Sequence, residues 1–528
     1  MSQRSKLAFT VILAALLFGL LADRLLKETP WGLNVLLTIA LLLAAVFGVS
    51  HWRRERLTGG GRWFALPALV FAGMLAVRDT ATLNAFNVAA VLCCLAVLAY
   101  RGRTGRVLVA GIGAYLRSAV MGGIGALIGV LPLAVMEARW LEFNLGGNSR
   151  LLTRLIFGVV LALPLLAIFG GLFAAADANF EQLLRDVFSF DLDSLIRHAF
   201  LSGLWAWLAA GMLWLLFFFS HNTNPAQAVR PARFSLSIIE IGVVLGLLNA
   251  LFATFVITQL RYFFGGAALV LDTADASNQL TFAEYARRGF FELVVVSVLL
   301  LMVLLVAHWI TRRDNPQHAT AFRVLAGGLI TLLYVIMASA LHRMWTYMQV
   351  YGLTELRLYT TAFMLWLAVV FAWFAATTLR ERGERFAFGA VISGLATLLV
   401  LNLINPIDLI VRTNIERIVN RAPGLAADTP AVTRSAERLD SLYLGQLAID
   451  TSDAVPALMS NFSRLNSDDG CRVAAGLSHR YDSEAKADWR TTNISRLTAA
   501  VWQSQQWRQY FMEAGAACFD EVGPRRFD

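Results

Sequence analysis

The sequence predicts an all-α fold, a polytopic helical membrane protein of about 10–12 transmembrane helices with a small soluble α-helical domain at the C-terminal end. The first reason is composition: 58% of the 528 residues are hydrophobic and 15% are charged, too little charge to cover a soluble globule of that size. Secondly, apolar stretches of roughly 17 or more residues, enough to cross about 30 Å of hydrocarbon, recur from Leu7 to Ile404. Thirdly, residues 411–528 are soluble in character, with apolar residues at helical spacing.

The apolar stretches define the expected spans in order. They are residues 7–22, 31–49, 63–77, 81–100, 118–136, 155–174, 200–219, 236–258, 290–310, 324–341, 361–379 and 387–404. The first is short and has a basic flank, as a signal peptide has. No small-residue cleavage site precedes Asp23, however, and a second span follows closely. We therefore interpret the first span as a retained membrane anchor.

The formal net charge of +9 suggests a nucleic-acid partner, but the location of the charge argues against one. The excess lies in short loops between spans and not in the soluble segment. These loops carry Arg53, Arg54, Arg56, Arg62, Arg101, Arg103, Arg106, Arg230, Arg233, Arg312, Arg313, Arg323, Arg380, Arg382 and Arg385. Arginine-rich short loops face the cytoplasm, so the mixed-charge connections 175–199, 259–289 and 343–360 face outward. By alternation the C-terminal segment is also outside.

One region breaks this alternation. Strict counting from a cytoplasmic N-terminus places residues 137–154 outside, whereas the later basic loops require them inside. Residues 107–136 contain Pro132 and the run MGGIGALIG, which favour a broken or re-entrant element, because irregular backbone is tolerated in a bilayer only where protein buries it or it lines a cavity. The alternative is a local failure of the positive-inside rule. Gly125/Gly129 and Gly242/Gly246 have the small-xxx-small spacing that allows close helix packing.

The chain divides into N-terminal transmembrane helices (1–106), a core transmembrane region (107–410) and a soluble C-terminal helical domain (411–528). Pro406 ends the last span, and in TSDAVPALMSNF a capping-type Thr/Ser/Asp cluster precedes Pro456 in the first turn of a helix. We expect a further helix at about 493–514. Cys471 and Cys518 are the only thiols of this domain. They either form a disulfide, if the compartment is oxidising, or remain two free thiols.

Charged and aromatic residues gather in the outward connections. In LTFAEYARRGFFEL, a capping box at Thr281 starts a helix on which Glu284, Arg288 and Glu292 share one face. The expected polar cluster comprises Asp177, Glu284, Arg287, Arg288, Glu292, His342, Arg343, Tyr347, Tyr351, Glu355, Arg357, Asn405, Asp408 and Arg412. It is either a set of interface anchors and local ion pairs or a functional surface beneath the C-terminal domain.

Outside this cluster, Glu240 is the main intramembrane carboxylate of interest. It lies near the cytoplasmic end of its span, where it either carries a proton or cation or extends to the surface. Arg117 has two interpretations as well, as an interfacial arginine or as part of the broken element. No phosphate-binding loop, nucleophile elbow or pair of metal-ligating histidines is present in the sequence. We therefore expect no catalytic residue, no cofactor and no bound metal.

Several sequence blocks occur together between about Leu163 and Leu458. They include RYFFGG with LTFAEYARRGFFEL, SALHRMWTYMQVYGLTELRLY, ADANF, NPIDLIVRTNIER and LDSLYLGQLAIDTSDAVPAL. In these blocks the chain resembles the domain of unknown function 4173 family of uncharacterised bacterial membrane proteins. The resemblance implies a multi-pass bacterial membrane protein with no established activity. The placement of the basic loops, in turn, predicts the bacterial inner membrane with the C-terminal domain in the periplasm.

Three function classes remain open. The leading hypothesis is a non-enzymatic sensor, envelope-assembly or partner-binding protein that contacts membrane lipids and binds a protein through residues 411–528. The second is a transporter or flippase-like protein in which Glu240 and the polar cluster line a path. The third is a membrane-embedded transferase that uses dispersed acids and histidines.

Overall fold

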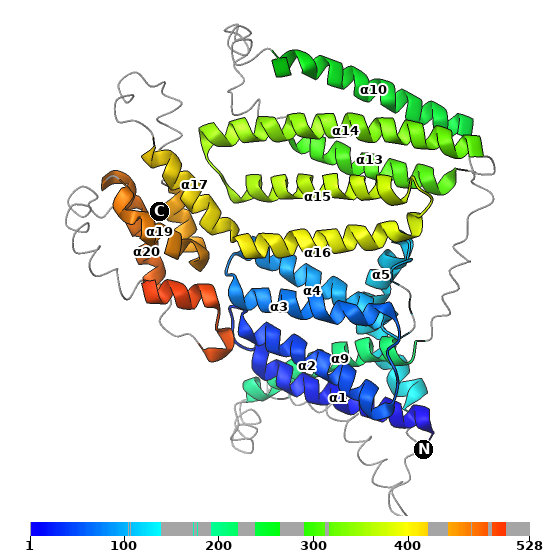
Figure 1. Cartoon of the computed structure of the whole chain (residues 1–528). Coiled ribbons are helices and arrows are strands. Elements are labelled where there is room, and N and C mark those ends of the chain that lie inside the picture. Colours follow the sequence, from blue (N-terminus) through cyan, green and yellow to red (C-terminus); the bar gives the residue numbers. More distant parts are fainter. Residues whose placement is uncertain are drawn as a thin grey trace, which may run out of the picture.

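The computed structural model describes residues 2–103, 105, 107–138, 173, 177, 192–219, 238–264, 290–311, 316–420, 442–465, 467–483 and 488–502 (Figure 1). No β-strand occurs among these residues, and ten of their helices are long and apolar enough to cross a membrane. The predicted all-α polytopic fold is confirmed. The expected span at 155–174 lies outside the described residues.

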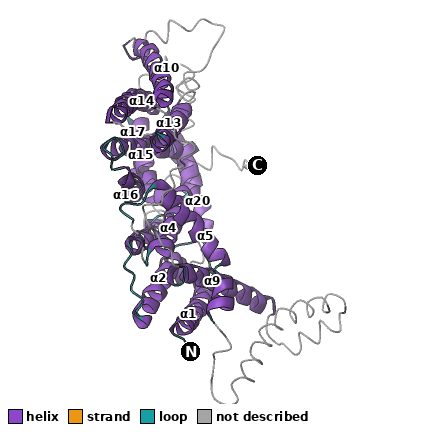
Figure 2. Cartoon of the chain, turned by 90° about the vertical axis from the view of Figure 1, so that its right-hand side faces the viewer, coloured by secondary structure: helices purple, strands orange, loops and turns teal. Residues whose placement is uncertain are grey.

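The bundle consists of two packed halves with a single helix between them. The first half contains α1 (Gln3–Leu26), α2 (Leu33–Arg53), α3 (Ala65–Val77), α4 (Ala81–Arg101) and α9 (Leu192–Phe217). The second contains α10 (Ile238–Phe264), α13 (Phe290–Ile310), α14 (Pro316–Tyr351) and α15 (Glu355–Thr377). Each half has its own apolar core. Helix α16 (Phe386–Ile404) joins them and is the least buried of the ten candidate spans. Figure 2 shows the resulting narrow wall of helices.

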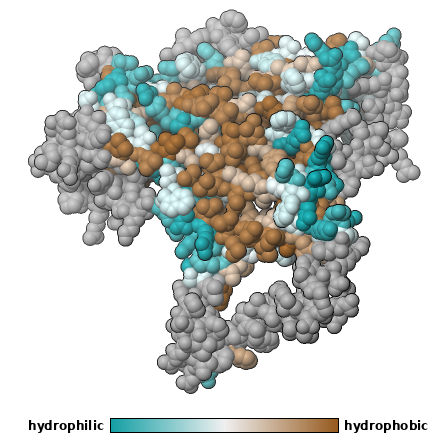
Figure 3. Space-filling model, turned by 60° about the horizontal axis from the view of Figure 1, so that its bottom comes forward, coloured by the Kyte–Doolittle hydropathy of each residue, from teal (hydrophilic) through white to brown (hydrophobic). Residues whose placement is uncertain are grey.

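The chain is an integral, multi-pass membrane protein. Its surface carries a broad hydrophobic band between hydrophilic margins (Figure 3). We call the two ends of the bundle the domain end, with the α3–α4 loop 78–80 and the α14–α15 loop 352–354, and the basic end, with loops 54–59 and 378–385. The C-terminal domain lies at the domain end, on the opposite side from the N-terminus (Figure 1).

The region where a broken element is expected, 107–136, contains a bent pair of helices. Helix α5 (Ile112–Ile128) is followed, after a 50° bend, by α6 (Val130–Pro132) and the π-helix η2 (Leu133–Glu137). Proline has no N–H to donate into the preceding turn, which accounts for the irregular helix around Pro132. A methyl group at Gly211 of α9 would collide with the carbonyl oxygens of Gly125 and Ala126. The small-xxx-small spacing of α5 thus permits close packing on α9, whereas no atom of the described residues lies within 4 Å of a side-chain carbon added at Gly246.

Both ends of this broken element lie at the basic end of the bundle. Near its start, the Nε of Arg101, the last residue of α4, donates to Ser118 Oγ over 3.0 Å. At its finish, Glu137 pairs with Arg4 in the first turn of α1. The element therefore enters and leaves on one side, which resolves the counting conflict. Helix α9 then starts at the domain end, where His198 Nδ1 lies 2.7 Å from Asp23 Oδ2 of α1.

The C-terminal domain is a compact set of short helices. It contains α17 (Pro406–Val419), helix 442–450, η6 (Ser452–Ala454), α19 (Val455–Asn461), η7 (Phe462–Arg464), α20 (Ser467–Ser483), η8 (Trp489–Thr491) and helix 494–502. Its core includes Ile407, Ile410, Leu447, Leu458 and Leu477. Asn405 has a left-handed backbone (φ 56°) and its side chain caps α17, with Pro406 in the first turn. The last span ends there, as predicted.

Two further helices were predicted in this domain, one starting near Pro456 and one at about 493–514. Pro456 lies in the first turn of α19, and the Thr451 side chain caps the preceding turn by accepting from the Asp453 N–H. This confirms the predicted helix start. The helix expected at 493–514 is described over 494–502, and the remainder lies outside the described residues.

Candidate functional site

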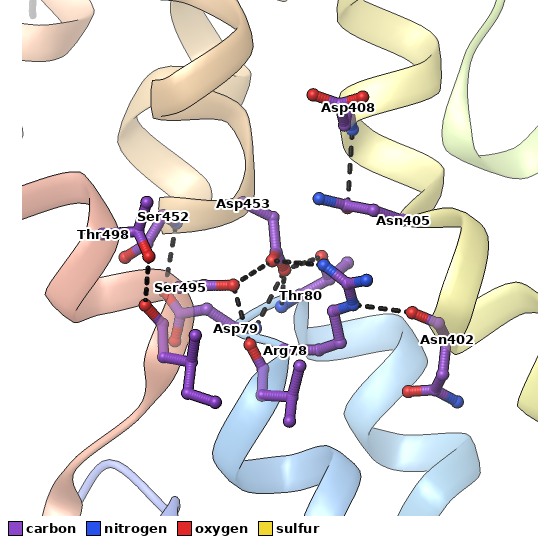
Figure 4. A network of polar contacts seen from close by, with 12 residues as sticks. Arg78, Asp79, Thr80, Asn402, Asn405, Asp408, Ser452, Asp453, Ser495 and Thr498 are labelled. Carbon is purple, nitrogen blue, oxygen red and sulfur yellow. Dashed lines mark hydrogen bonds and ion pairs between the residues drawn. The ribbon is translucent and has the colours of Figure 1, made fainter. Parts of the chain in front are cut away.

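Three distant segments meet in a buried polar network where the C-terminal domain contacts the bundle (Figure 4). One is the α3–α4 loop, one includes η6, and one is the start of helix 494–502. We call this network the polar latch. It comprises Arg78, Asp79, Thr80, Thr451, Ser452, Asp453, Asn493, Ser495 and Arg496.

The carboxylate of Asp453 is the centre of the latch. Its side chain is fully buried, and its Oδ2 accepts from the N–H of Asp79 at 2.8 Å and from the N–H and hydroxyl of Thr80 at 3.1 and 2.8 Å. The Ser495 hydroxyl donates to Oδ1, and Arg78 Nη1 lies 3.7 Å from it. A buried carboxylate is stable only when paired and hydrogen-bonded, and both oxygens meet that condition.

Asp79 makes the reciprocal contact from the bundle to the domain. Its Oδ2 accepts from the Ser452 N–H at 3.1 Å, and its Oδ1 accepts from Arg496 Nε at 2.7 Å. Burial by itself would raise the pKa of Asp79. The charge of Arg496 and the Ser452 hydrogen bonds outweigh burial and hold this pKa below its usual range. The ionised carboxylate is therefore the form that the docked domain favours.

The start of helix 494–502 also satisfies the open carbonyl groups at the end of α3. Asn493 Nδ2 donates to the carbonyl oxygens of Leu75 and Arg78, both at 2.9 Å. Ser495 Oγ, whose single proton is within reach of both Asp453 Oδ1 and Val77, lies 2.8 Å from the Val77 carbonyl oxygen. The last carbonyls of a helix have no partner within the helix. Here the C-terminal domain supplies those partners, so docking completes the end of the span.

A second contact fixes the domain to the other half of the bundle. The Asn414 side chain of α17 makes two hydrogen bonds with the backbone of Leu353. Asn414 Oδ1 accepts from the Leu353 N–H and Asn414 Nδ2 donates to the Leu353 carbonyl, each at 2.8 Å. The Glu355 N–H donates to Tyr443 Oη at 3.1 Å. Burial raises the pKa of Tyr443, which keeps the hydroxyl neutral. The domain thus binds both halves of the bundle at the same end.

The two carboxylates of the latch lie within a region that matches a known family. The model of the family described as Domain of unknown function (DUF4153) matches residues 65–460, about three quarters of the chain. The chain belongs to the DUF4153 family. No curated protein and no solved structure matches it significantly. The prediction that the chain resembles family 4173 was therefore wrong about which family it is. The quoted blocks are short and lie mainly at helix ends, where many polytopic proteins place Arg, Tyr and Glu; an uncharacterised family is confirmed.

Part of the expected polar cluster of this DUF4153 protein lies at the second contact. Arg357 stacks on Tyr347, with Cζ 4.4 Å from the ring centroid, and its Nη1 donates to the Gly352 carbonyl at 2.5 Å. Asn405, Asp408 and Arg412 lie along α17, where Arg412 Nε donates to Asp408 Oδ2 at 2.7 Å. In both groups the described contacts are local, and whether these residues also form a functional surface stays a prediction.

The other predicted residues are dispersed or undescribed. Asp177, Glu292 and His342 are exposed, and Arg343 is half-buried. Glu284, Arg287, Arg288 and the side chain of Tyr351 lie outside the described residues. Glu240 is exposed in the first turn of α10. Helix α10 lies at the edge of the bundle (Figure 1). Cys471 is disulfide-bonded, whereas Cys518 lies outside the described residues, so their pairing stays a prediction.

Sequence reasoning missed the latch of this DUF4153 protein. A local signal existed, because the tripeptide Arg78-Asp79-Thr80 fills the whole connection between two apolar helices. Charges in so short a loop at the bilayer surface need partners. Asp453 itself is recognisable in the sequence only as part of a helix-capping cluster. Within the described residues no group of three or more His, Cys, Asp or Glu side chains has a metal-binding arrangement, and the latch oxygens bind donors of the chain itself.

Proposed function

We propose that this DUF4153 protein is a non-enzymatic protein of the bacterial inner membrane whose latched C-terminal domain binds a protein partner in the periplasm. One observation carries the proposal. The exposed face of helix 494–502 is apolar, with Ile494, Leu497 and Val501 exposed by 56%, 55% and 52%. These positions recur at helical spacing on one face. An exposed apolar face on a folded domain is typical of a protein–protein interface.

The latch explains why this face points away from the domain. Ser495 and Ala499, on the opposite face of the helix, are buried, and Ser495 and Arg496 bind Asp453 and Asp79. The helix is held at its start by a buried ionic network and cannot rotate its apolar side inward without breaking those contacts. A preorganised surface binds a partner with a smaller loss of conformational entropy.

The side of the membrane is supported by charge and by cysteine chemistry. Arginine-rich loops mark the cytoplasmic side, and the domain is at the other end of the bundle. Cys471 is disulfide-bonded, whereas Cys93 and Cys94 are free, and disulfides persist in oxidising compartments. In intact cells, a membrane-impermeant thiol reagent should label Cys471 only after reduction. Labelling that requires permeabilised cells would place the domain in the cytoplasm.

Site-specific photo-crosslinking tests the partner. A photo-reactive residue at Leu497 should capture one protein species in living cells, and Ile494→Glu on the same face should abolish the capture. The matched control places the same residue at Ser463, which is exposed on η7. Protease resistance of the domain in the Ile494→Glu variant separates lost binding from lost folding. Equal capture at both sites, or none at Leu497, would exclude this face as the interface.

A further inference from the structure

The basic end carries two pairs of consecutive tryptophan and arginine residues. Trp52 and Arg53 end α2, with the Arg53 guanidinium carbon 5.2 Å from the Trp52 ring centroid. Arg62 and Trp63 lie in η1 (Gly60–Phe64), 5.3 Å apart by the same measure. The two indoles are 69% and 68% exposed. We call residues 52–63 the Trp–Arg hairpin.

The hairpin is held rigidly by the neighbouring loop. The Gly59 N–H donates to the Gly102 carbonyl at 3.0 Å, and the Gly60 N–H donates to the Gly105 carbonyl at 2.8 Å. A methyl group at Gly59 would collide with the backbone of Arg101 and Gly105, so only glycine allows this approach. The exposed side chains are therefore presented from a fixed backbone.

The charges of the hairpin are available to a ligand. Its one acid, Glu55, is paired with Arg103 at 2.8 Å. Arg54 and Arg56 are exposed, and neither guanidinium makes a hydrogen bond or ion pair with a described residue. Arg53 and Arg62 hold Thr10 Oγ1 and the Leu57 carbonyl at 2.6 and 2.8 Å. This division leaves two anchored and two unengaged arginines between the indoles.

We propose that the Trp–Arg hairpin binds the phosphate headgroup of an anionic phospholipid in the adjoining leaflet. The hairpin connects two candidate spans, Leu33–Arg53 and Gly60–Val77, which places it where hydrocarbon gives way to headgroups. Exposed tryptophans prefer that depth, and the adjacent arginines meet the lipid phosphate. A soluble anion would need the arginines but would gain nothing from two indoles at the bilayer surface. The proposal is independent of any partner of the C-terminal domain.

Lipid binding to the purified full-length protein tests the site. Native mass spectrometry should show tighter binding of phosphatidylglycerol than of phosphatidylcholine. The double variant Arg54→Gln/Arg56→Gln should weaken phosphatidylglycerol binding about 25-fold, since each arginine at an anionic surface contributes about fivefold. The matched control, Arg380→Gln/Arg382→Gln, removes the same charge from exposed positions at the same end and should change binding less than about twofold.

Two further arms distinguish the source of the phosphate and the part played by the indoles. Glycerol phosphate should fail to displace the lipid, and Trp52→Leu/Trp63→Leu should weaken binding about two- to fivefold. If the two double arginine variants lost the same affinity for phosphatidylglycerol, the binding would depend only on general surface charge, and the proposal would be overturned. Displacement by glycerol phosphate would overturn it in favour of a soluble anion.

Discussion

At the domain end, the enclosed side chains of Asp79, Asp453 and Arg496 form contacts between the bundle and the C-terminal domain. At the basic end, Arg54 and Arg56 face outward and have no side-chain partner among the described residues. The side chains of Asp453 and Asp79 are 0% and 9% exposed. Both ends are rich in charge, but burial separates their roles. Enclosed charges hold the C-terminal domain on the bundle, and exposed charges are available to the membrane or to a ligand.

The largest expected effect is at the centre of the latch. Asp453→Ala leaves the Thr80 donors unpaired and Arg78 without its buried counter-ion, so domain docking should lose about 3–5 kcal/mol. Limited proteolysis in membranes should then release the domain. Asp408→Asn, which removes a carboxylate from an exposed pair with Arg412, is the matched control and should cost less than about 1 kcal/mol. Comparable losses in both variants would mean that burial does not distinguish the two ionic contacts.

The second prediction concerns acid. Because the pKa of Asp79 is lowered in the docked state, its contribution is present above the ordinary aspartate pKa of about 3.9 and is lost as pH falls toward the lowered value. Docking should therefore weaken below about pH 4. Asp79→Asn should cost about 2 kcal/mol at neutral pH and flatten this acid response, as measured by protease resistance against pH. An unchanged acid response in the variant would assign it to other carboxylates.

The third prediction separates the two contacts of the domain. Asn414→Ala removes both hydrogen bonds to Leu353 and leaves the latch intact, so it should cost about 2 kcal/mol. Hydrogen exchange should show faster exchange of the Leu353 amide, while the amides of Asp79 and Thr80 stay protected by Asp453. Loss of protection at all three amides would show that the contacts form one cooperative unit.

The spans and their breaks were predictable because they depend on local composition. Apolar length defined the spans, Pro132 with its glycines indicated the broken element, and Asn405-Pro406 indicated the end of α16. The latch was not predictable in the same way. Asp79 and Asp453 are separated by most of the chain. The hydrophobic periodicity of the sequence does not indicate that the α3–α4 loop contacts the turn at η6. The Asp408–Arg412 pair lies within one helix turn and is therefore recognisable from the sequence, although it is more exposed than the carboxylates of the latch.

The smallest expected effect completes the comparison at the basic end. Arg54→Gln/Arg56→Gln should leave the free energy of unfolding within about 0.5 kcal/mol of the wild type, because neither side chain has a described partner to lose. Arg103→Gln is the informative contrast. Arg103 binds Glu55 and donates to the Phe217 carbonyl at the end of α9, so its loss should cost about 1 kcal/mol in a thermal unfolding series. If the double variant proved the less stable of the two, the exposed arginines would have a structural role, and the division between enclosed and available charge would fail at this end.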